Sequence, residues 1–300
     1  MWYNKRIKSF KFLPIMALIT LFFLLLLGSC GKKTIRSNSG NREPLLESQI
    51  IDLSVKSEIM GRNMPVRIYL PKGYGDGKDY PVWYGLHGYS SVETMWTNAG
   101  LTQVADELID SGEIKSMIMV FPFVKDDALK EFNKQLQEYG KLGERYIDQY
   151  ISKELIPYID SNYDTDTTSK GRYIGGFSMG GMMALRIAFH HPDLFSKAGG
   201  YSAAVTSSDF SGTQLEKWLY PDENTDEITD VANYARKKGF NKLQFYLDWG
   251  HENDPFSEGL QSLSDALQKR KVKVESKVNN GGHNLIPENF PDYLKFYMAE

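Results

Sequence analysis

The chain has 300 residues, of which 41% are hydrophobic and 24% are charged, and its formal net charge at pH 7 is −3. This composition is too apolar for a disordered chain, and the small negative charge argues against a nucleic-acid partner, which normally needs a basic surface. Cys30 is the only cysteine, so the chain cannot form an internal disulfide.

The N-terminal 29 residues have the pattern of an export signal. Four basic residues precede an apolar run from residue 12 to residue 27, which is shorter than the roughly 20 residues that span a bilayer. The following Leu-Gly-Ser-Cys resembles the lipobox of bacterial lipoproteins, in which cleavage leaves the cysteine to carry a lipid. We therefore predict a lipoprotein signal peptide over residues 1–29 and an exported protein that is lipid-anchored through Cys30 to a bacterial membrane, at the cell surface or facing the periplasm. An ordinary signal peptide or N-terminal anchor is the alternative.

Residues 30–48 contain Lys, Ser, Asn and Gly without hydrophobic periodicity, which predicts a flexible tether. Residues 49–300 are expected to form a single domain, because strand and helix patterns alternate along all of it. We expect strands over residues 50–60, 64–71, 80–88, 116–123, 171–176, 195–204, 242–250 and 272–278. We expect helices over residues 101–111, 144–161, 179–190, 231–238 and 256–271 and after residue 291, with a polar stretch over residues 205–230.

This alternation predicts an α/β fold with a mostly parallel central sheet and helices on both faces. The first two strands are separated only by residues 61–63, so an antiparallel hairpin is expected at the start of the domain.

Gly176-Phe177-Ser178-Met179-Gly180 lies between a predicted strand and a predicted helix and has the G-x-S-x-G spacing of a nucleophile elbow. Such a sharp turn requires strained dihedral angles at the serine and small residues two positions away on each side. The start of the following helix also favours negative charge near the serine oxygen. We therefore interpret Ser178 as a nucleophile rather than as the capping residue of a glycine-rich turn.

A serine nucleophile needs a base, and the chain has five histidines. Four are poorly placed, because they precede the elbow, end the helix that the elbow begins, or lie where an acid is expected: His87, His190, His191 and His251. His283 follows the last predicted strand. Hydrolases with this elbow have the order serine, acid, histidine along the chain, so we predict that His283 is the base.

The acid is expected in "LDWGHENDPF", which offers three carboxylates. Asp254 lies in the loop and is favoured. Asp248 lies within the predicted strand, where the pleat fixes the direction of its side chain, and it ranks second, before Glu252. A metal site from His251, Glu252 and Asp254 is poorly supported, because the short cluster has no matching distal ligands.

Two backbone N–H groups are expected to stabilise the oxyanion. One belongs to Met179, the residue after the nucleophile. The other is expected from Tyr89, in the loop after the third strand, where Gly88 permits a close backbone turn and His87 has a structural role. Trp96, a little farther along, is predicted to form an apolar wall of the substrate pocket.

Five stretches carry a resemblance to a known family: "PVWYGLHGYSSVETMW", "YISKELIPYIDSNY", "GRYIGGFSMGGMMALRIAFHHPDLFSKAGGYSAA", "LQFYLDWGHENDPF" and "GGHNLIPENFPDYLKFY". They resemble an esterase family of α/β-hydrolases that includes esterase D-like enzymes, feruloyl and acetyl xylan esterases, enterochelin esterase-like proteins and mycolyltransferases. The resemblance implies Ser178 as nucleophile, Asp254 as acid and His283 as base. Family members often have a shorter spacing between glycine and acid than Gly250 to Asp254, so Asp248 stays open as a substitute.

The resemblance implies an α/β-hydrolase fold and a serine carboxylesterase that needs no cofactor and works through an acyl-enzyme. For an exported, lipid-anchored protein we expect small-molecule or glycan esters as substrates, with acetyl or feruloyl groups, rather than cytosolic thioesters. An acyltransferase on the same fold, or a catalytically inactive lipid-anchored binding protein, is the alternative.

Overall fold

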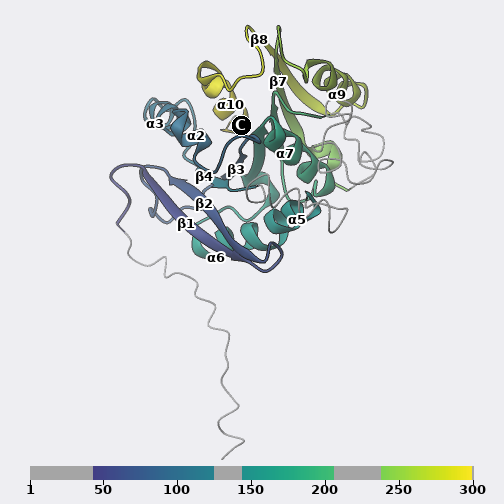
Figure 1. Cartoon of the computed structure of the whole chain (residues 1–300). Coiled ribbons are helices and arrows are strands. Elements are labelled where there is room, and N and C mark those ends of the chain that lie inside the picture. Colours follow the sequence, from purple (N-terminus) through teal and green to yellow (C-terminus); the bar gives the residue numbers. More distant parts are fainter. Residues whose placement is uncertain (1–42, 125–143, 206–237, 299–300) are drawn as a thin grey trace, which may run out of the picture. The chain divides into compact units, whose positions relative to one another are not determined.

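The computed structural model describes residues 43–124, 144–205 and 238–298, which form an eight-stranded sheet flanked by helices (Figure 1). The strand order is β1-β2-β4-β3-β5-β6-β7-β8. β2 is antiparallel to β1 and to β4, and all other neighbouring strands are parallel. This topology confirms the predicted α/β architecture with an antiparallel hairpin at its start.

The strands are β1 (Gln49–Ser57), β2 (Arg62–Leu70), β3 (Val82–Leu86), β4 (Ile118–Pro122), β5 (Arg172–Phe177), β6 (Lys197–Tyr201), β7 (Gln244–Gly250) and β8 (Lys273–Asn279). The helices are α2 (Met95–Asn98), α3 (Leu101–Asp110), α5 (Glu144–Gln149), α6 (Ile156–Asn162), α7 (Met179–His190), α9 (Ser257–Lys269) and α10 (Phe290–Met298). A π-helical segment covers Tyr150–Leu155, and short 3-10 turns cover Ser169–Gly171, Phe240–Lys242 and Pro287–Asn289. The predicted signal peptide with Cys30 and nearly all of the predicted helix over residues 231–238 lie outside the described residues.

Helices cover both faces of the sheet (Figure 1), and the core forms two layers of side chains, one on each face. On one face, aromatic side chains of the central strands pack against α2, α3 and α10, as Trp83, Phe121 and Tyr201 do. On the other face, aliphatic side chains such as Val120 and Ile174 pack with α5, α6, α7 and α9. Successive strand residues point to opposite faces, so strands buried on both sides are almost continuously apolar.

The turn between β1 and β2 lies two to three residues earlier than the predicted turn at residues 61–63. β1 ends at Ser57, whose hydroxyl donates a hydrogen bond to the Glu154 carboxylate. The N–H groups of Glu58 and Ile59 donate to the same carboxylate, at 3.0 and 3.1 Å. Glu154 is distant in the sequence, so a local turn pattern does not reveal this contact.

The predicted helix over residues 144–161 is interrupted by the π-helical segment Tyr150–Leu155. Pro157 lies in the first turn of α6 and has no N–H to donate, and its ring would clash with the carbonyl four residues earlier in a regular α-helix. A wider turn just before Pro157 removes both conflicts, so the chain continues in one direction through a change of helix type.

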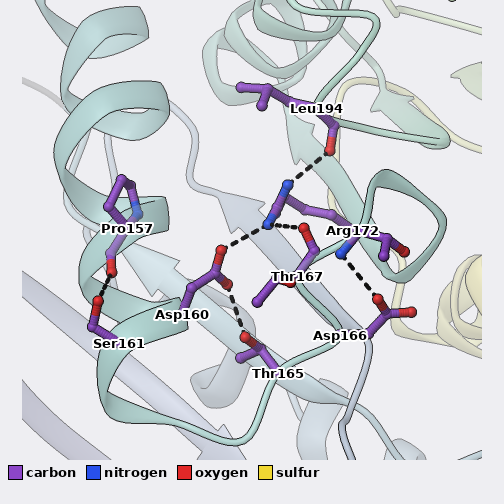
Figure 2. A network of polar contacts seen from close by, with 9 residues as sticks. Pro157, Asp160, Ser161, Thr165, Asp166, Thr167, Arg172 and Leu194 are labelled. Atoms are coloured by element: carbon purple, nitrogen blue, oxygen red, sulfur yellow. Dashed lines mark hydrogen bonds and ion pairs between the residues drawn. The ribbon is translucent and has the colours of Figure 1, made fainter. Parts of the chain in front are cut away.

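A partly buried network of polar contacts fixes the start of β5, the strand that leads into Ser178 (Figure 2). The Arg172 guanidinium donates to the Asp160 carboxylate at 2.7 Å and to the carbonyls of Thr167 and Leu194 at 2.9 and 3.2 Å. Arg172 is 4% exposed, so these charge-assisted bonds form where water competes little. They tie β5 to α6 and to the loop before β6.

Residues just before the predicted domain boundary at residue 49 already contact the domain. Leu45 donates its N–H to the Tyr74 carbonyl and accepts from the Gly73 N–H, and the Ser48 hydroxyl donates to Asp106. The last residues of the predicted tether thus lie against the domain. Within residues 43–124, 144–205 and 238–298, every helix is too short or too polar to cross a membrane.

Candidate active site

Ser178 lies at a sharp turn between β5 and α7 and has strained backbone angles, φ 56° and ψ −121°. Its N–H donates to the Tyr201 carbonyl at 2.9 Å, which holds the turn against the end of β6. A Cβ atom on Gly176 would collide with the backbone of Gly180, and one on Gly180 would lie 2.5 Å from the His87 carbonyl oxygen. Both positions therefore require glycine, as the elbow geometry predicts.

His283 reaches the elbow from the loop after β8, and its Nε2 lies 2.9 Å from the Ser178 Oγ. Two aromatic rings fix the imidazole. Phe177 stacks on it, with ring centroids 5.0 Å apart and planes 19° apart, and Phe256 packs edge-on at 4.8 Å. The imidazole is therefore held in one plane, with Nε2 directed at the serine oxygen.

The Asp254 carboxylate lies on the other side of the His283 ring, and the Asp254 side chain is fully buried. It accepts the N–H groups of Gly250 and Phe256, at 2.8 and 3.1 Å, and the Ser202 hydroxyl at 2.6 Å. Burial alone would raise the pKa of Asp254, but the nearby His283 ring and the hydrogen bonds from Ser202 and the two backbone groups outweigh it and hold the pKa at about 2. The carboxylate is thus ionised at neutral pH.

The loops that carry the acid and the histidine are bonded to each other. The His251 N–H donates to the Asn279 carbonyl at 2.8 Å, and the Glu252 N–H donates to the Gly281 carbonyl at 3.3 Å. β7 and β8 are parallel neighbours, so both loops start at the same edge of the sheet. His251 and Glu252, which the sequence analysis weighed with Asp254 as a metal cluster, have exposed side chains. Of these three residues, Asp254 is the one that contacts His283.

Asp248 faces another part of the molecule. Its buried carboxylate accepts the hydroxyl of Tyr293 on α10, and burial raises its pKa to about 6. Alternation along β7 directs this side chain to the face of the sheet that α10 covers. The structure therefore brings Asp254, and not Asp248, to His283.

Ser202, which the sequence analysis did not consider, lies between the acid and the histidine. Its Oγ is 2.6 Å from the Asp254 carboxylate and 2.6 Å from His283 Nδ1. The available signal was its place directly after β6, the parallel neighbour of β5, because the carboxyl ends of parallel strands meet at one edge.

The loop after β3 lies against the elbow, and His87 fixes one of its peptides. His87 Nε2 accepts the Val124 N–H at 3.1 Å, so Nδ1 carries the proton and donates to the Gly88 carbonyl at 2.8 Å. Because a peptide is planar and trans, the Tyr89 N–H points opposite to that carbonyl. A Cβ on Gly88 would lie 3.6 Å from the Ser178 Cβ, so this peptide is close to the nucleophile.

Met179 is the first residue of α7, where amide groups have no acceptor within the helix. The N–H groups of Met179 and Tyr89 are the two oxyanion donors predicted from the sequence. Both belong to segments that adjoin Ser178.

The prediction that Trp96 forms a wall of the substrate pocket is wrong. Trp96 is 0% exposed and lies in the aromatic layer of the core, edge-on to Trp83 and Tyr201. Its indole N–H donates to the Leu86 carbonyl at 3.3 Å, just before the loop with Gly88. Trp96 thus supports that loop from inside, and its pattern in the sequence did not distinguish a core residue from a pocket residue.

The chain is similar to known esterases in sequence and in fold. The model of the family described as "Putative esterase" matches residues 57–288. An endo-1,4-beta-xylanase/feruloyl esterase of Xylanibacter ruminicola is 33% identical over 248 residues, which cover 80% of this chain and 30% of the relative. The chain thus spans less than a third of that relative's length.

Solved structures show the same fold. A ferulic acid esterase matches with a TM-score of 0.72 and 22% identity, over 84% of this chain and 98% of the other. A ferulic acid esterase of Anaeromyces mucronatus, solved in complex with ferulic acid, matches with a TM-score of 0.63 and 18% identity, over 87% and 93%. These matches confirm the predicted α/β-hydrolase fold.

Proposed function

This chain belongs to the "Putative esterase" family, and we propose that it is a serine carboxylesterase with Ser178 as nucleophile, His283 as general base and Asp254 as acid. The observation that carries the proposal is the hydrogen bond of 2.9 Å between Ser178 Oγ and His283 Nε2 at a strained strand-to-helix turn. A hydroxyl is a weak nucleophile until a neighbouring base can take its proton.

Acylation begins when the Ser178 oxygen attacks the ester carbonyl carbon and its proton passes to His283 Nε2. The negative charge on the carbonyl oxygen is stabilised by the N–H groups of Met179 and Tyr89. The tetrahedral intermediate collapses, and His283 returns the proton to the leaving alcohol. The ionised Asp254 carboxylate stabilises the imidazolium formed in between.

Deacylation repeats these steps with water. His283 takes a proton from the water molecule, whose oxygen attacks the acyl carbon, and then returns the proton to the Ser178 oxygen as the carboxylic acid leaves. The same donors stabilise the second oxyanion. Free enzyme, acid and alcohol are the products.

We propose feruloyl esters attached to carbohydrate as the substrate class. The named activity of the Xylanibacter ruminicola relative includes feruloyl esterase, and the Anaeromyces mucronatus esterase was solved with ferulic acid. Acetyl esters of glycans are the alternative within the same reaction class.

The test is hydrolysis of methyl ferulate and p-nitrophenyl acetate by the full chain and two variants. Ser178→Ala and His283→Ala are expected to lower kcat roughly 10⁴-fold or more, because each removes a group that the reaction requires. Ser264→Ala is the matched control, since Ser264 is also buried and hydrogen-bonded, to Ser276 at 2.6 Å, but on α9. A folded Ser178→Ala or His283→Ala variant with near-normal turnover contradicts the proposal.

We also propose that the chain is exported and lipid-anchored through Cys30, on the support of the sequence alone. In a bacterium that processes lipoproteins, the protein is expected to incorporate a labelled fatty acid and to sediment with membranes. Cys30→Ser is expected to abolish the label while esterase activity remains. An unlabelled wild-type protein would refute the anchor.

A further inference from the structure

The direct contact between the acid and the histidine is too long for a hydrogen bond. His283 Nδ1 lies 3.7 Å from the nearest Asp254 oxygen, whereas nitrogen-to-oxygen hydrogen bonds are about 2.7–3.2 Å. The Ser202 Oγ lies 2.6 Å from each of the two groups. The hydroxyl of Ser202 is therefore the link between them.

The donors and acceptors of this link have a fixed direction. An ionised carboxylate only accepts, so the single Ser202 proton must be donated to Asp254. The Ser202 oxygen then accepts a hydrogen bond from the N–H at His283 Nδ1. A neutral imidazole has one N–H, which leaves Nε2 free of a proton and able to accept from Ser178. The contact at 2.9 Å between Nε2 and the Ser178 oxygen fits this tautomer.

The backbone of Ser202 is strained where the hydroxyl is placed. Its φ is +46°, a left-handed conformation that glycine adopts without steric cost and serine does not. Its N–H donates to the Asp248 carbonyl at 2.8 Å, so the residue is held in this conformation by the neighbouring strand. Ser202 is 3% exposed, and its side chain is directed into the site rather than toward solvent.

We propose that Ser202 is a positioning residue that couples Asp254 to His283 and sets the tautomer of the base, an inference that rests on the proposed function of the Ser178 site. When the imidazole becomes imidazolium during attack, its Nδ1 proton stays on nitrogen and is stabilised through the hydroxyl by the carboxylate. No proton leaves the site through this link.

The experiment compares Ser202→Ala and Ser202→Gly with the wild-type full chain. Both variants are expected to lower kcat for methyl ferulate by about 10- to 100-fold with KM unchanged. Loss of a hydrogen bond that orients a functional side chain has an effect of this size in metal sites. The acidic limb of the kcat/KM profile is expected to move to lower pH, because the imidazolium loses its link to the carboxylate. Ser202→Gly is expected to melt at a higher temperature than Ser202→Ala, since it relieves the positive φ.

Four results would overturn either this inference or the proposed function. A wild-type kcat and pH profile in Ser202→Ala would overturn the inference, because His283 would then bind Asp254 directly. If the activities of the two variants rank in the order of their melting temperatures and the pH profile does not move, Ser202 has a structural role and the inference is overturned. An inactive wild type would overturn the proposed function itself. If the wild type is active, Ser178→Ala is inactive and the Ser202 variants are unaffected, only this inference is overturned. Ser264→Ala is the control for removal of a buried hydroxyl.

Discussion

At the scale of single residues, the elbow depends on backbone atoms that approach too closely for side chains. Gly180 faces the carbonyl oxygens of His87 and Leu86, where an added Cβ would lie 2.5 and 2.6 Å away. These carbonyls lie at the end of β3 and at the start of the loop that supplies the Tyr89 N–H. A side chain at position 180 would therefore disturb both the turn that carries the nucleophile and the loop that carries a proposed oxyanion donor.

Gly180→Ala is expected to lower the free energy of unfolding by roughly 1–3 kcal/mol, because the overlap is with backbone and a shift of the loop is the only relief. It is also expected to lower kcat for ester hydrolysis. Gly281→Ala is the stability control, since its nearest neighbour is the end of the flexible Ile286 side chain at 3.3 Å. Urea denaturation of both variants measures the effect, and equal stability of Gly180→Ala and wild type would contradict it.

Residue-level contacts are also where the sequence was least informative. The pattern around Ser178 indicated the elbow because all of its requirements are local. The choice between Asp248 and Asp254 depended on which face of β7 each side chain occupies. Ser202 is 52 residues from Asp254 and 81 from His283, so only the folded sheet brings the three together.

At the scale of elements, α7 is fixed at both ends. It begins at the elbow, and its last residue, His190, lies 2.9 Å from the Asp148 carboxylate of α5. His191 contacts the other oxygen of Asp148 at 2.5 Å. Burial acts to raise the pKa of Asp148, but the hydrogen bonds from the two histidines outweigh it and hold the pKa at about 2.

This depressed pKa predicts how stability changes in acid. The native state binds the proton of Asp148 less readily than the unfolded chain, whose carboxyl has a pKa near 3.8. The stabilisation is present above that value and is lost as the pH falls toward 2. Asp148→Asn is expected to be less stable at pH 5 by roughly 1–2 kcal/mol and to lose less stability between pH 4 and pH 2.

Urea denaturation at pH 5, 4, 3 and 2 measures this difference. Asp265→Asn, at an exposed position on α9, is the matched control for removing one carboxylate. The same pH dependence in Asp148→Asn and wild type would show that the contact between α5 and α7 contributes nothing.

The helices and strands were largely predicted, and the exceptions have physical causes. Residues 179–190 were predicted as a helix with the bounds that the structure shows, because the elbow fixes the start and His191-Pro192 ends the periodic pattern. The hairpin turn was predicted two to three residues too late, and the π-helical segment was not predicted. The position of the turn depends on Glu154, which is distant in the sequence. The π-helical segment depends on how the helix accommodates Pro157, which a hydrophobic pattern does not report.

At the scale of the whole molecule, an aromatic layer joins the sheet to α10. Tyr293 of α10 stacks on Tyr201 with ring centroids 3.8 Å apart and donates its hydroxyl to the buried Asp248. Lys197, at the start of β6, donates to the carbonyls of Phe296 and Tyr297 at 2.9 Å each. α10 follows the His283 loop, so this layer also holds the end of the loop that carries the base.

The raised pKa of Asp248 makes the stability of the fold depend on pH in the opposite direction to the lowered pKa of Asp148. Burial raises it to about 6, so the native state holds this proton more tightly than the unfolded chain does. Its contribution is favourable at low pH and is lost as the pH rises through 6. Asp248→Asn is expected to be more stable than wild type at pH 8, by roughly 1–3 kcal/mol, and to show a smaller decline between pH 5 and pH 8. Thermal denaturation across this range measures it, and a variant that is less stable at pH 8 would contradict the prediction.

The measurement that tests the central claim most directly is the site of the covalent intermediate. The full chain is mixed with p-nitrophenyl ferulate, quenched in acid within the first turnover, digested and mapped by mass spectrometry. The Ser178–His283 geometry predicts one feruloyl group on the peptide that contains Ser178, and none in Ser178→Ala. A feruloyl group on another residue, or full turnover by Ser178→Ala, would contradict it.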